Sequence, residues 1–480
     1  MSNLYSLFAA AAARAGDRPA VVEQGAVRLL YSQLDAEVAS WSVALAGLGA
    51  RPGDRILVQA EKSIDCALLY LAALRAGLVW VPLNTAYTPA EIATFIADAE
   101  PAIAVHGGEL TIDDIKARRV AGAAFETVDR GPDELAALLY TSGTTGRSKG
   151  AMLSHDNLAS NAMVLKDVWR WRDGDVLIHA LPIYHVHGLF VALHGALLNG
   201  STMLWHKAFD AGAVIADFAR ATILMGVPTF YVRLAADPRL TREAAAGMRL
   251  FVSGSAPLLD ATFEAFEAAV GHRILERYGM TEAGMICSNP YDGARIAGTV
   301  GFPLPGVAAR VADDDGSELP RGTPGVLEIK GPNLFKGYWR QPEKTAEEMR
   351  GDGYFITGDV ATMAEDGRVA IVGRAKDLII AGGLNIYPKE IELALDAVDG
   401  VTESAVIGVP HEDLGEAVVA IVVPADPAID EASILAEIAG TLARFKQPRR
   451  ILFADALPRN AMGKVQKAAL REAHRDLFAV

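Results

Sequence analysis

Cysteine is scarce in this chain of 480 residues, which holds only two, Cys66 and Cys287. The two stand far apart in the sequence and form no CxxC pair. This usage argues against a disulfide framework and against a cysteine-rich metal site, and it fits a reducing compartment. We therefore expect a cytoplasmic protein.

Positive charge is also in short supply. The sequence has 45 lysine and arginine residues against 59 aspartate and glutamate residues, which gives a formal net charge of −14. A protein with this balance lacks the broad basic surface that is typical of nucleic-acid binding, so no nucleic-acid partner is expected. The balance still allows a local basic pocket for a phosphorylated ligand.

No stretch of the sequence has the pattern of a membrane segment. The first apolar run follows no basic region and predicts an amphipathic helix that ends near Gly16 and Pro19, not a signal peptide. The most apolar long stretch, 176–198, contains four histidines, and imidazole groups oppose a bilayer crossing. We expect no membrane partner.

The sequence does have length and an alternating pattern. A chain of 480 residues is too long for one hydrophobic core, so at least two domains are expected. Strand-like runs such as 55–60 and 80–84 alternate with helical patterns such as 66–77 and 89–100, which predicts α/β units with parallel strands. From about Gly306, short alternating strands with glycine and proline turns predict a β-rich subdomain.

The last hundred or so residues predict a compact α+β unit. Helical patterns at 389–401 and 431–445 flank two strand-like runs between 403 and 424. The predicted fold class is therefore α/β, with a large N-terminal α/β domain that includes the β-rich subdomain (1–374) and a small C-terminal α+β domain (377–480), which the resemblance described below implies is mobile.

The strongest local motif is 138–150, where an apolar run leads into a loop rich in glycine and hydroxyl side chains. Glycines let backbone N–H groups approach phosphate oxygens, hydroxyls add donors, and Lys149 supplies a positive charge. Gly150 follows the lysine where a Walker-type loop has Ser or Thr, so the loop is of another kind. A flexible hairpin loop is the alternative interpretation. The residues predicted to bind phosphate are Thr141, Ser142, Gly143, Thr144, Thr145, Gly146 and Lys149.

Five further motifs follow in order along the chain. They are Tyr-Gly-Met-Thr-Glu at 278–282, Tyr-Phe-Ile-Thr-Gly-Asp at 354–359, Gly-Arg-Ala-Lys-Asp at 373–377, Gly-Gly-Leu-Asn-Ile-Tyr-Pro at 382–388 and Pro-Arg-Asn-Ala-Met-Gly-Lys at 458–464. Together with the loop, in this order and over this length, they resemble the adenylate-forming superfamily of acyl-CoA synthetases, ligases and adenylation domains. The resemblance covers nearly the whole chain, from about Asp17 to Leu470.

The resemblance implies an enzyme that uses ATP to convert a carboxylic acid to its acyl-adenylate, mainly by positioning and electrostatic stabilisation. It implies that Thr281 contacts the α-phosphate, that Glu282 binds Mg²⁺, and that Asp359 accepts both ribose hydroxyls. Lys464 would bridge the carboxylate and the α-phosphate. The other ATP-binding residues that it implies are Arg374 at the ribose and Gly254, Ser255, Ala256, Tyr278, Gly279 and Met280 around the nucleotide.

Each catalytic candidate also has a structural interpretation. Asp359 follows a glycine and suits a helix N-cap, and Glu282 suits the first turn of a helix, where it would pair with the dipole. Lys464 stands among other basic residues and suits a solvated basic face.

The resemblance also implies a second half-reaction, in which the thiol of coenzyme A attacks the adenylate. For this step the C-terminal domain rotates about a hinge near Lys376 and brings the loop Gly382-Gly383-Leu384-Asn385 to the active site. One departure from the family is Ser148, where proline is common; it removes no phosphate donor. Acetylation of Lys464 would remove its charge and silence adenylation.

Two features bear on which acid is activated. In the segment 182–188, His185 matches a family histidine near the acyl carboxylate, and His187 is either a substrate ligand or a hydrogen-bonded core residue. Arg277 directly precedes the Tyr-Gly-Met-Thr-Glu motif, and a guanidinium in an acyl pocket is costly unless the substrate brings a second carboxylate. The alternative is a surface pair between Arg277 and Glu276.

An arginine before that motif, together with a His-Val-His-Gly segment, resembles the malonyl-CoA synthetases, which act on malonate and often on methylmalonate. The resemblance implies that malonate, ATP and CoA give malonyl-CoA, AMP and pyrophosphate, with Arg277, His187 and Ser255 at the substrate. The alternatives are another short-chain acyl-CoA synthetase and an adenylation enzyme that loads a carrier-protein thiol.

Overall fold

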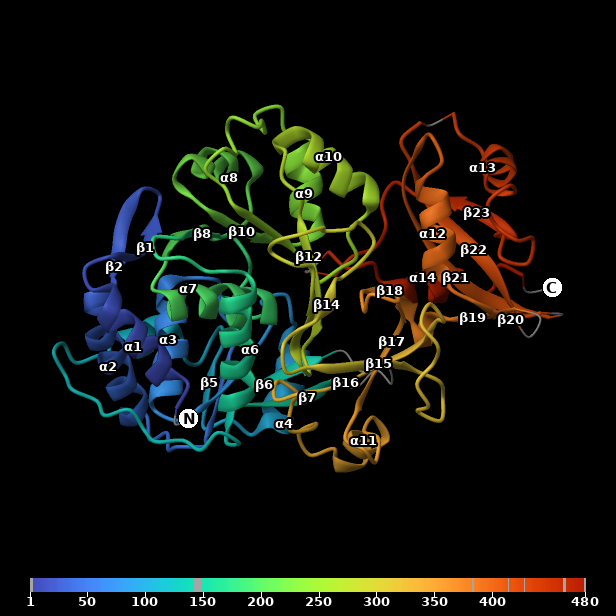
Figure 1. Cartoon of the computed structure of the whole chain (residues 1–480). Helices are drawn as coiled ribbons and strands as arrows, with labels where there is room; N and C mark the ends of the chain where they lie inside the picture. Colours follow the sequence, from blue (N-terminus) through green and yellow to red (C-terminus); the bar gives the residue numbers. More distant parts are fainter. Residues whose placement is uncertain are drawn as a thin grey trace. The chain divides into compact units, whose positions relative to one another are not determined.

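The structure is a computed structural model that describes residues 3–141, 148–381, 384–412, 414–426, 428–460 and 463–478 (Figure 1). The chain forms two compact units. Unit 1 comprises Met1–Ala308 and Ile329–Phe355, and unit 2 comprises Ala309–Glu328 and Ile356–Val480. The chain passes from unit 1 to unit 2, returns, and passes again, so neither unit is continuous in sequence.

The smaller sheet of unit 1 has five strands in the order β5-β3-β4-β6-β7. They are β3 (Arg55–Val58), β4 (Val79–Pro82), β5 (Ile103–Val105), β6 (Leu135–Thr141) and β7 (Lys149–Ser154). The first four are parallel, and helices α3 (Ile64–Arg75) and α4 (Pro89–Ala99) return the chain between them, as the alternating pattern predicts. β6 and β7 are antiparallel.

The larger sheet of unit 1 has nine strands in the order β14-β13-β12-β11-β10-β8-β9-β1-β2. They are β1 (Pro19–Glu23), β2 (Ala26–Leu30), β8 (Val176–His179), β9 (Thr202–Trp205), β10 (Ile223–Gly226), β11 (Leu250–Ser253), β12 (Leu275–Met280), β13 (Gly284–Ser288) and β14 (Phe302–Pro303). The six strands from β12 to β1 run parallel. Ser253 pairs with Glu276, so the turn after β11 lies beside the carboxyl end of β12, where open parallel sheets commonly bind ligands.

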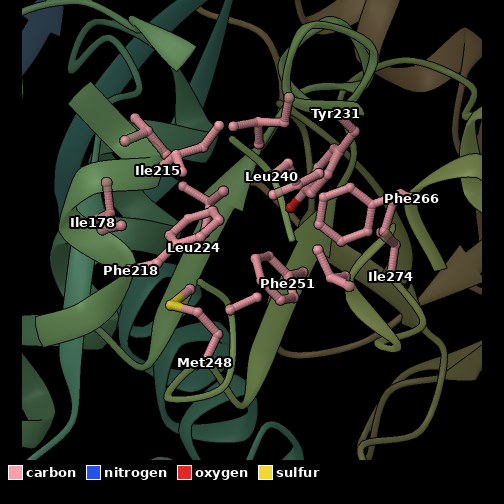
Figure 2. Close-up of a cluster of buried hydrophobic side chains, with 14 of the residues drawn as sticks. Ile178, Ile215, Phe218, Leu224, Tyr231, Leu240, Met248, Phe251, Phe266 and Ile274 are labelled. Carbon is pink, nitrogen blue, oxygen red and sulfur yellow. The ribbon is translucent and has the colours of Figure 1, made fainter. Parts of the chain in front are cut away.

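A hydrophobic cluster fixes this part of the sheet (Figure 2). Helices α8 (Ala211–Asp217), α9 (Pro228–Ala235) and α10 (Asp260–Val270) contribute side chains to it, together with β8, β10 and β11. The ring of Phe266 packs edge-on against Phe251 and Tyr231, with centroids 4.9 and 5.2 Å apart. The Tyr231 hydroxyl donates to the carbonyl of Val252 at 2.7 Å, which fixes α9 to β11.

The remaining helices of unit 1 are α1 (Tyr5–Ala15), α2 (Tyr31–Gly47), α5 (Ile112–Lys116), α6 (His155–Val168), α7 (His194–Asn199) and α11 (Pro342–Glu347). α1 ends at Ala15, directly before Gly16, as its sequence predicts, because Gly16 adopts a positive φ of 58°. A π-helix, η1 (His187–Leu193), leads directly into α7, and all its residues are buried. Such wide turns occur frequently at functional sites.

Unit 2 contains two sheets. The first has the order β15-β16-β17-β18 and the second β20-β19-β22-β21, with β23 beside β22. The strands are β15 (Ala308–Ala312), β16 (Gly325–Lys330), β17 (Phe355–Met363), β18 (Val369–Arg374), β19 (Ile379–Ala381), β20 (Leu384–Ile386), β21 (Val401–His411), β22 (Gly415–Pro424) and β23 (Arg450–Phe453). The helices are α12 (Pro388–Asp396), α13 (Glu431–Ile438) and α14 (Lys467–Ala473). The β-rich texture that begins near Gly306 forms the first sheet.

Two predicted helices are too long. The pattern at 389–401 predicts a helix, but α12 ends at Asp396 and β21 begins at Val401. The pattern at 431–445 predicts a single helix, but α13 ends at Ile438 and the chain turns through Gly440. Glycine is the poorest ordinary residue in a helix interior, which accounts for the early end. The predicted hinge and domain boundary at 374–377 stay a prediction, because the compact units are defined by packing and a hinge is defined by motion. Among the described helices, none is long and apolar enough to cross a membrane.

Candidate active site

Arg277, on β12, lies against the turn that follows β11. A Cβ at Gly254 would meet Cζ of Arg277 at 2.4 Å, so a larger residue there would force the guanidinium to move. Arg277 exposes 3% of its surface, and its buried Nε and Nη2 atoms have no hydrogen-bond partner among the described residues. Buried polar groups are nearly always paired, so this guanidinium is a candidate site for an anionic group.

The interpretation of Arg277 as part of a surface pair is wrong. Glu276 exposes only 6% of its surface, and neighbouring residues on a strand point to opposite faces of the sheet. The carboxylate of Glu276 accepts from the backbone N–H of Leu258 at 3.2 Å. Burial lowers the pKa of Arg277 to about 9, and electrostatic interactions with Tyr231 and Glu276 offset only part of this shift.

Two histidines lie near this guanidinium. His187 begins η1 and is fully buried, and its Nδ1 lies 3.3 Å from the hydroxyl oxygen of Ser255. The backbone N–H of His187 donates to Nδ1 of His185, also at 3.3 Å. Burial and then the charge of Arg277 lower the pKa of His185 to about 4, and they also lower the pKa of His187. Both rings are therefore neutral near pH 7 and serve as hydrogen-bonding groups.

The backbone around the histidines is tightly constrained. Ser255 is a non-glycine residue with a φ of 75°, a strained conformation that proteins retain mainly at functional sites. Gly188 packs directly on the carbonyl of Pro182, because a Cβ there would lie 1.9 Å from that oxygen. The predicted substrate residues Arg277, His185, His187 and Ser255 thus come together in unit 1, held by Gly254 and Gly188.

Glu282 lies in the turn between β12 and β13, so the interpretation as a residue in the first turn of a helix is wrong. It exposes 6% of its surface, and Tyr338 donates to its Oε1 at 3.1 Å. The described residues contain no cluster of three or more metal-ligating side chains. A single carboxylate nonetheless suits Mg²⁺, which commonly keeps several waters and binds one or two carboxylates together with substrate phosphates.

Lys149 begins β7, directly after the predicted phosphate loop. Its ammonium donates to Oε1 of Glu348 at 2.8 Å and lies over the ring of Tyr338, 4.6 Å from the centroid. Because β6 and β7 are antiparallel, the loop joins a β-hairpin, and phosphate binding remains a prediction. Of the predicted loop residues, Ser142, Gly143, Thr144, Thr145 and Gly146 lie outside the described residues.

The other predicted nucleotide residues of unit 1 flank this region. Tyr278, Gly279 and Met280 form the end of β12, and Thr281 lines a small pocket together with Asn161 and Asn333. Ala256 follows Ser255 in the turn after β11. Along the chain, the carboxyl end of β12 thus leads from Arg277 to Glu282.

Unit 2 carries the predicted ribose residues on adjacent strands. Asp359 on β17 and Arg374 on β18 are direct partners in the antiparallel register, and Nε of Arg374 lies 2.7 Å from Oδ1 of Asp359. Asp359 exposes 3% of its surface. It lies within a strand, so the interpretation as a helix N-cap is wrong.

Lys464 directly precedes the β-bridge between Val465 and Arg459, and its N–H donates to the side chain of Asn460 at 3.0 Å. Its basic neighbours pair with acids: Arg471 with Asp377 at 2.9 Å and Lys467 with Glu392. Among the described residues no carboxylate forms an ion pair with Lys464, and its side chain is exposed, which fits a solvated basic face as well as a catalytic role. Burial and then the positive charge of Arg374 lower the pKa of Lys464 to about 8, while the negative charge of Asp359 opposes this shift. Much of the Lys464 side chain is nevertheless exposed.

The predicted hinge and thiol-step residues are only partly described. Lys376 lies in a short 3₁₀ turn, Ala375–Asp377, between the two sheets of unit 2. Leu384 and Asn385 belong to β20, and Leu384 is exposed. Gly382 and Gly383 lie outside the described residues.

Three residues near the candidate site escape sequence reasoning. Tyr231 contributes to the electrostatic environment of Arg277, and Tyr338 and Glu348 connect Lys149 to Glu282. Tyr231 stands in an apolar helical pattern, which predicts a core residue. Tyr338 and Glu348 stand far along the chain from the residues that they contact, so only the fold reveals their contacts.

Comparisons with known proteins show the family to which the chain belongs. Residues 8–339 match the family model described as AMP-binding enzyme, and residues 390–464 match that of its C-terminal domain. The chain is 37% identical over 477 residues to a feruloyl-CoA synthase from Amycolatopsis sp, covering 96% of each sequence. It is 35% identical over 482 residues to a malonate–CoA ligase from Arabidopsis thaliana, covering 89% of this chain and 79% of that protein.

A crystal structure of ATP-bound MatB from Rhodopseudomonas palustris superposes on the chain with a TM-score of 0.94. The identity is 51%, and the match covers 99% of this chain and 100% of that one. The predicted fold class, a large N-terminal α/β domain followed by a small C-terminal domain, is thereby confirmed, as is the resemblance to the adenylate-forming superfamily. The chain belongs to the AMP-binding enzyme family, and it is an AMP-forming acyl-CoA synthetase.

Proposed function

We propose that this synthetase activates malonate, and also methylmalonate, to give the corresponding CoA thioester, AMP and pyrophosphate. The observation that carries the proposal is Arg277, whose Nε and Nη2 are buried without a hydrogen-bond partner among the described residues. The malonate–CoA ligase among the relatives and the similarity to MatB support it.

The electrostatics favour a dicarboxylate over a monocarboxylate. A guanidinium in a dry pocket binds a carboxylate through charge-assisted and often bidentate hydrogen bonds. The distal carboxylate of malonate supplies that partner, whereas acetate or butyrate leaves Arg277 uncompensated. Breaking a buried pair by removing one partner costs roughly 3–5 kcal/mol, which at 1.36 kcal/mol per tenfold is on the order of a hundred- to several-thousand-fold.

Neutral donors and acceptors complete the proposed acyl site. His185 and His187 are uncharged near pH 7, so they orient the substrate by hydrogen bonds without adding a competing cation. Ser255 Oγ, 3.3 Å from His187 Nδ1, is a further hydrogen-bonding group. Methylmalonate keeps both carboxylates and adds one methyl group, so only the volume of the site opposes it.

The remaining site residues would serve adenylation. Lys149 and the glycine-rich loop would hold the β- and γ-phosphates, Thr281 the α-phosphate, and Asp359 with Arg374 the ribose. Glu282 would hold Mg²⁺, which neutralises phosphate charge when bound. Lys464 would bridge the substrate carboxylate and the α-phosphate. Its role requires the charged ammonium, so acetylation of Lys464 would stop this step.

Thioester formation would follow a rotation near Lys376 that brings the loop Gly382-Gly383-Leu384-Asn385 to the adenylate. In this step the residues that bind the carboxylate and phosphates hold the mixed anhydride in place while the thiol attacks its carbonyl carbon. AMP then leaves with the electron pair of the broken C–O bond.

The test is an AMP-release assay with malonate, methylmalonate, acetate and butyrate, each with and without CoA. We expect kcat/KM for malonate to exceed that for the two monocarboxylates by at least a hundredfold, with full turnover only when CoA is present. A preference for butyrate would overturn the assignment of the substrate but keep the synthetase. Turnover with a carrier-protein thiol and none with CoA would indicate the carrier-loading alternative.

A further inference from the structure

A buried lysine connects the two sheets of unit 1. Lys62 lies between β3 and α3, in the smaller sheet, and exposes 8% of its surface. Its Nζ lies 2.9 Å from Nδ1 of His179 and donates to the carbonyl oxygen of the same residue at 2.7 Å. His179 is the last residue of β8 in the larger sheet. Lys62 therefore holds both the backbone and the ring of a residue at the carboxyl end of the other sheet.

The surroundings of Lys62 are unusual for a cation. Its Nζ lies over the ring of Trp205, 4.5 Å from the centroid, and Trp205 is the direct partner of His179 in the register of β8 and β9. Among the residues that the structure describes, no carboxylate pairs with Lys62, and burial lowers its pKa well below the ordinary value. A buried cation without an acidic partner costs stability, and an apolar side chain would fill the same space at lower cost. A role in function accounts for a lysine at this position.

The hydrogen bonds of His179 determine which of its ring nitrogens carries the proton. Nε2 lies 3.0 Å from the carbonyl oxygen of Gly188, and because a carbonyl oxygen only accepts, Nε2 is the protonated nitrogen. Burial and then the charge of Lys62 lower the pKa of His179, so the ring is neutral near pH 7 and Nδ1 is an acceptor. Lys62 is thus the donor to Nδ1. A lysine side chain has at least two N–H groups whether or not it is charged, so both of its contacts with His179 persist in either state.

Gly188 lies in the first turn of η1, directly after His187. A Cβ at Gly188 would lie 1.9 Å from the carbonyl oxygen of Pro182, so the segment is confined on that side, and His179 holds its carbonyl group. The backbone N–H of His187 donates to Nδ1 of His185 at 3.3 Å. The backbone at the start of η1 therefore determines where both candidate substrate histidines lie.

We propose that Lys62 is a positioning residue of the acyl site, which acts through the ring of His179 on the start of η1. It thereby fixes His185 and His187 for the carboxylate groups of the acid. The inference rests on the proposed function, which places these two histidines at the substrate. Neither Lys62 nor His179 belongs to the residues predicted to bind ATP. Breaking this chain of contacts should therefore weaken the binding of the acid and leave the binding of ATP unchanged.

The experiment measures kcat and the KM values of malonate and ATP, by AMP release in the presence of CoA, for the wild-type chain and for Lys62→Met. Methionine fills the space of the lysine stem but has no N–H to donate. The KM of malonate should rise about three- to tenfold, the usual effect of one lost hydrogen bond. The KM of ATP and kcat should stay within about twofold of wild type. A residue that only stabilises the fold would lower the amount of active enzyme, and with it kcat, but would change neither KM.

A double-mutant cycle tests whether Lys62 acts through His179. His179→Leu removes the ring and should raise the KM of malonate at least as much as Lys62→Met does. In the His179→Leu background, Lys62→Met should add less than about a twofold change, because the group through which it acts is already gone. His179→Gln is the conservative variant, since its amide has an N–H for the carbonyl of Gly188 and an oxygen that accepts from Lys62. Its KM for malonate should stay within about twofold of wild type.

The chain offers a matched control at the other end of the same helix. The hydroxyl oxygen of Tyr70 lies 2.7 Å from Nε2 of His194, and both side chains are fully buried. His194 directly follows η1 and begins α7. Tyr70→Phe therefore removes a hydrogen bond to a buried histidine beside η1, but at the end away from His187. It should leave the KM values of malonate and ATP within about twofold of wild type.

Three results would overturn the inference. They are an unchanged KM of malonate in Lys62→Met, fully additive effects in the cycle with His179→Leu, and a rise in the KM of malonate in Tyr70→Phe as large as that in Lys62→Met. If Lys62→Met fails to fold, the two variants of His179 decide, because equal KM values for His179→Gln and His179→Leu would also overturn it. A wild-type chain that prefers butyrate overturns the proposed substrate instead, and the same comparisons are then made on the KM of butyrate.

Discussion

Two arginines beside neighbouring parallel strands of the same sheet meet opposite surroundings. Arg249 precedes β11 at its amino end, where Nε donates to Oδ1 of Asp175 at 2.7 Å and Nη2 pairs with Oδ2 of the same carboxylate. Arg277 lies on β12 past the carboxyl end of the neighbouring strand β11, where its buried Nε and Nη2 have no hydrogen-bond partner among the described residues. At the amino end of the sheet, Asp175 provides a carboxylate partner for Arg249. At the carboxyl end, no described residue provides such a partner for Nε and Nη2 of Arg277.

The electrostatic consequence differs accordingly. Burial disfavours both charged guanidinium groups, but hydrogen bonds and the charge of Asp175 outweigh it at Arg249 and raise the pKa of that residue. At Arg277 no such partner offsets the burial, and the pKa falls to about 9. A buried arginine with a carboxylate partner in the protein stabilises the fold, whereas a buried arginine without one is available to bind an anionic ligand.

The largest expected effect is on activity at the unpaired arginine. Arg277→Met should lower kcat/KM for malonate on the order of a hundred- to several-thousand-fold, because the distal carboxylate loses its partner. The same variant should hardly change kcat/KM for butyrate, and Arg277→Lys should restore only part, since lysine lacks the planar fork. Steady-state kinetics with malonate, methylmalonate and butyrate provide the measurement. If the Arg277→Met variant still preferred malonate over butyrate, Arg277 would not bind the distal carboxylate of the substrate.

Replacing Arg249, the paired arginine, should lower the free energy of unfolding and leave substrate preference unchanged. Arg249→Met leaves Asp175, which is 3% exposed at its side chain, without its ion-pair partner, and this should cost about 3 kcal/mol of unfolding free energy. Denaturant unfolding measures the change, and the malonate-to-butyrate ratio of kcat/KM should stay at the wild-type value. Combining the change with Asp175→Asn should recover part of the loss. A shifted substrate ratio would show that the two arginines do not have separate roles.

A smaller effect should follow from displacing the unpaired guanidinium without removing it. Gly254→Ala places a Cβ 2.4 Å from Cζ of Arg277, so the guanidinium must move, and kcat/KM for malonate should fall about tenfold. Gly247→Ala is the control, because a Cβ at that position meets nothing closer than 3.6 Å. Equal losses in the two variants would show that the contact with Gly254 does not position Arg277.

The smallest expected effect is on a neighbouring histidine. The pKa of His185 is lowered to about 4 by burial and, next, by the charge of Arg277. Removing that charge in Arg277→Met should raise this pKa toward its ordinary value, because the imidazolium form loses a repulsion. Histidine resonances in an NMR titration report the change, and Arg249→Met should leave them unmoved. A fall in the pKa would contradict the geometry.

Much of the fold follows from local pattern. The alternating runs at 55–60 and 66–77 became β3 and α3 because strand and helix periodicities differ and each buries one face. The order of strands does not follow in the same way, since β1 pairs with β9 across most of unit 1 and no local signal encodes that contact. The end of α13 at Ile438 was missed because Gly440 outweighs an otherwise continuous apolar period.

Some residues of the candidate site can likewise be found from the sequence, whereas the contacts between them cannot. Glu282 is visible in the sequence because it belongs to the Tyr-Gly-Met-Thr-Glu motif that resembles the family, and Arg277 because it directly precedes that motif. Gly254 as the neighbour of Arg277, and Tyr338 as the neighbour of Glu282, depend on how separate strands and turns meet. Contacts of that kind are a property of the folded chain, so sequence pattern alone could not supply them.

The discontinuity of the two units has a consequence for synthesis. Residues Ala309–Glu328 leave the ribosome with β15 and most of β16, but their sheet is completed only by β17 and β18, which end at Arg374. At about 5–20 residues per second, the nascent chain carries this exposed two-strand edge for a few seconds before its partners emerge. During that interval the returning segment Ile329–Phe355 completes unit 1. The order of translation therefore favours folding of the unit that contains Arg277 before the unit that contains Lys464.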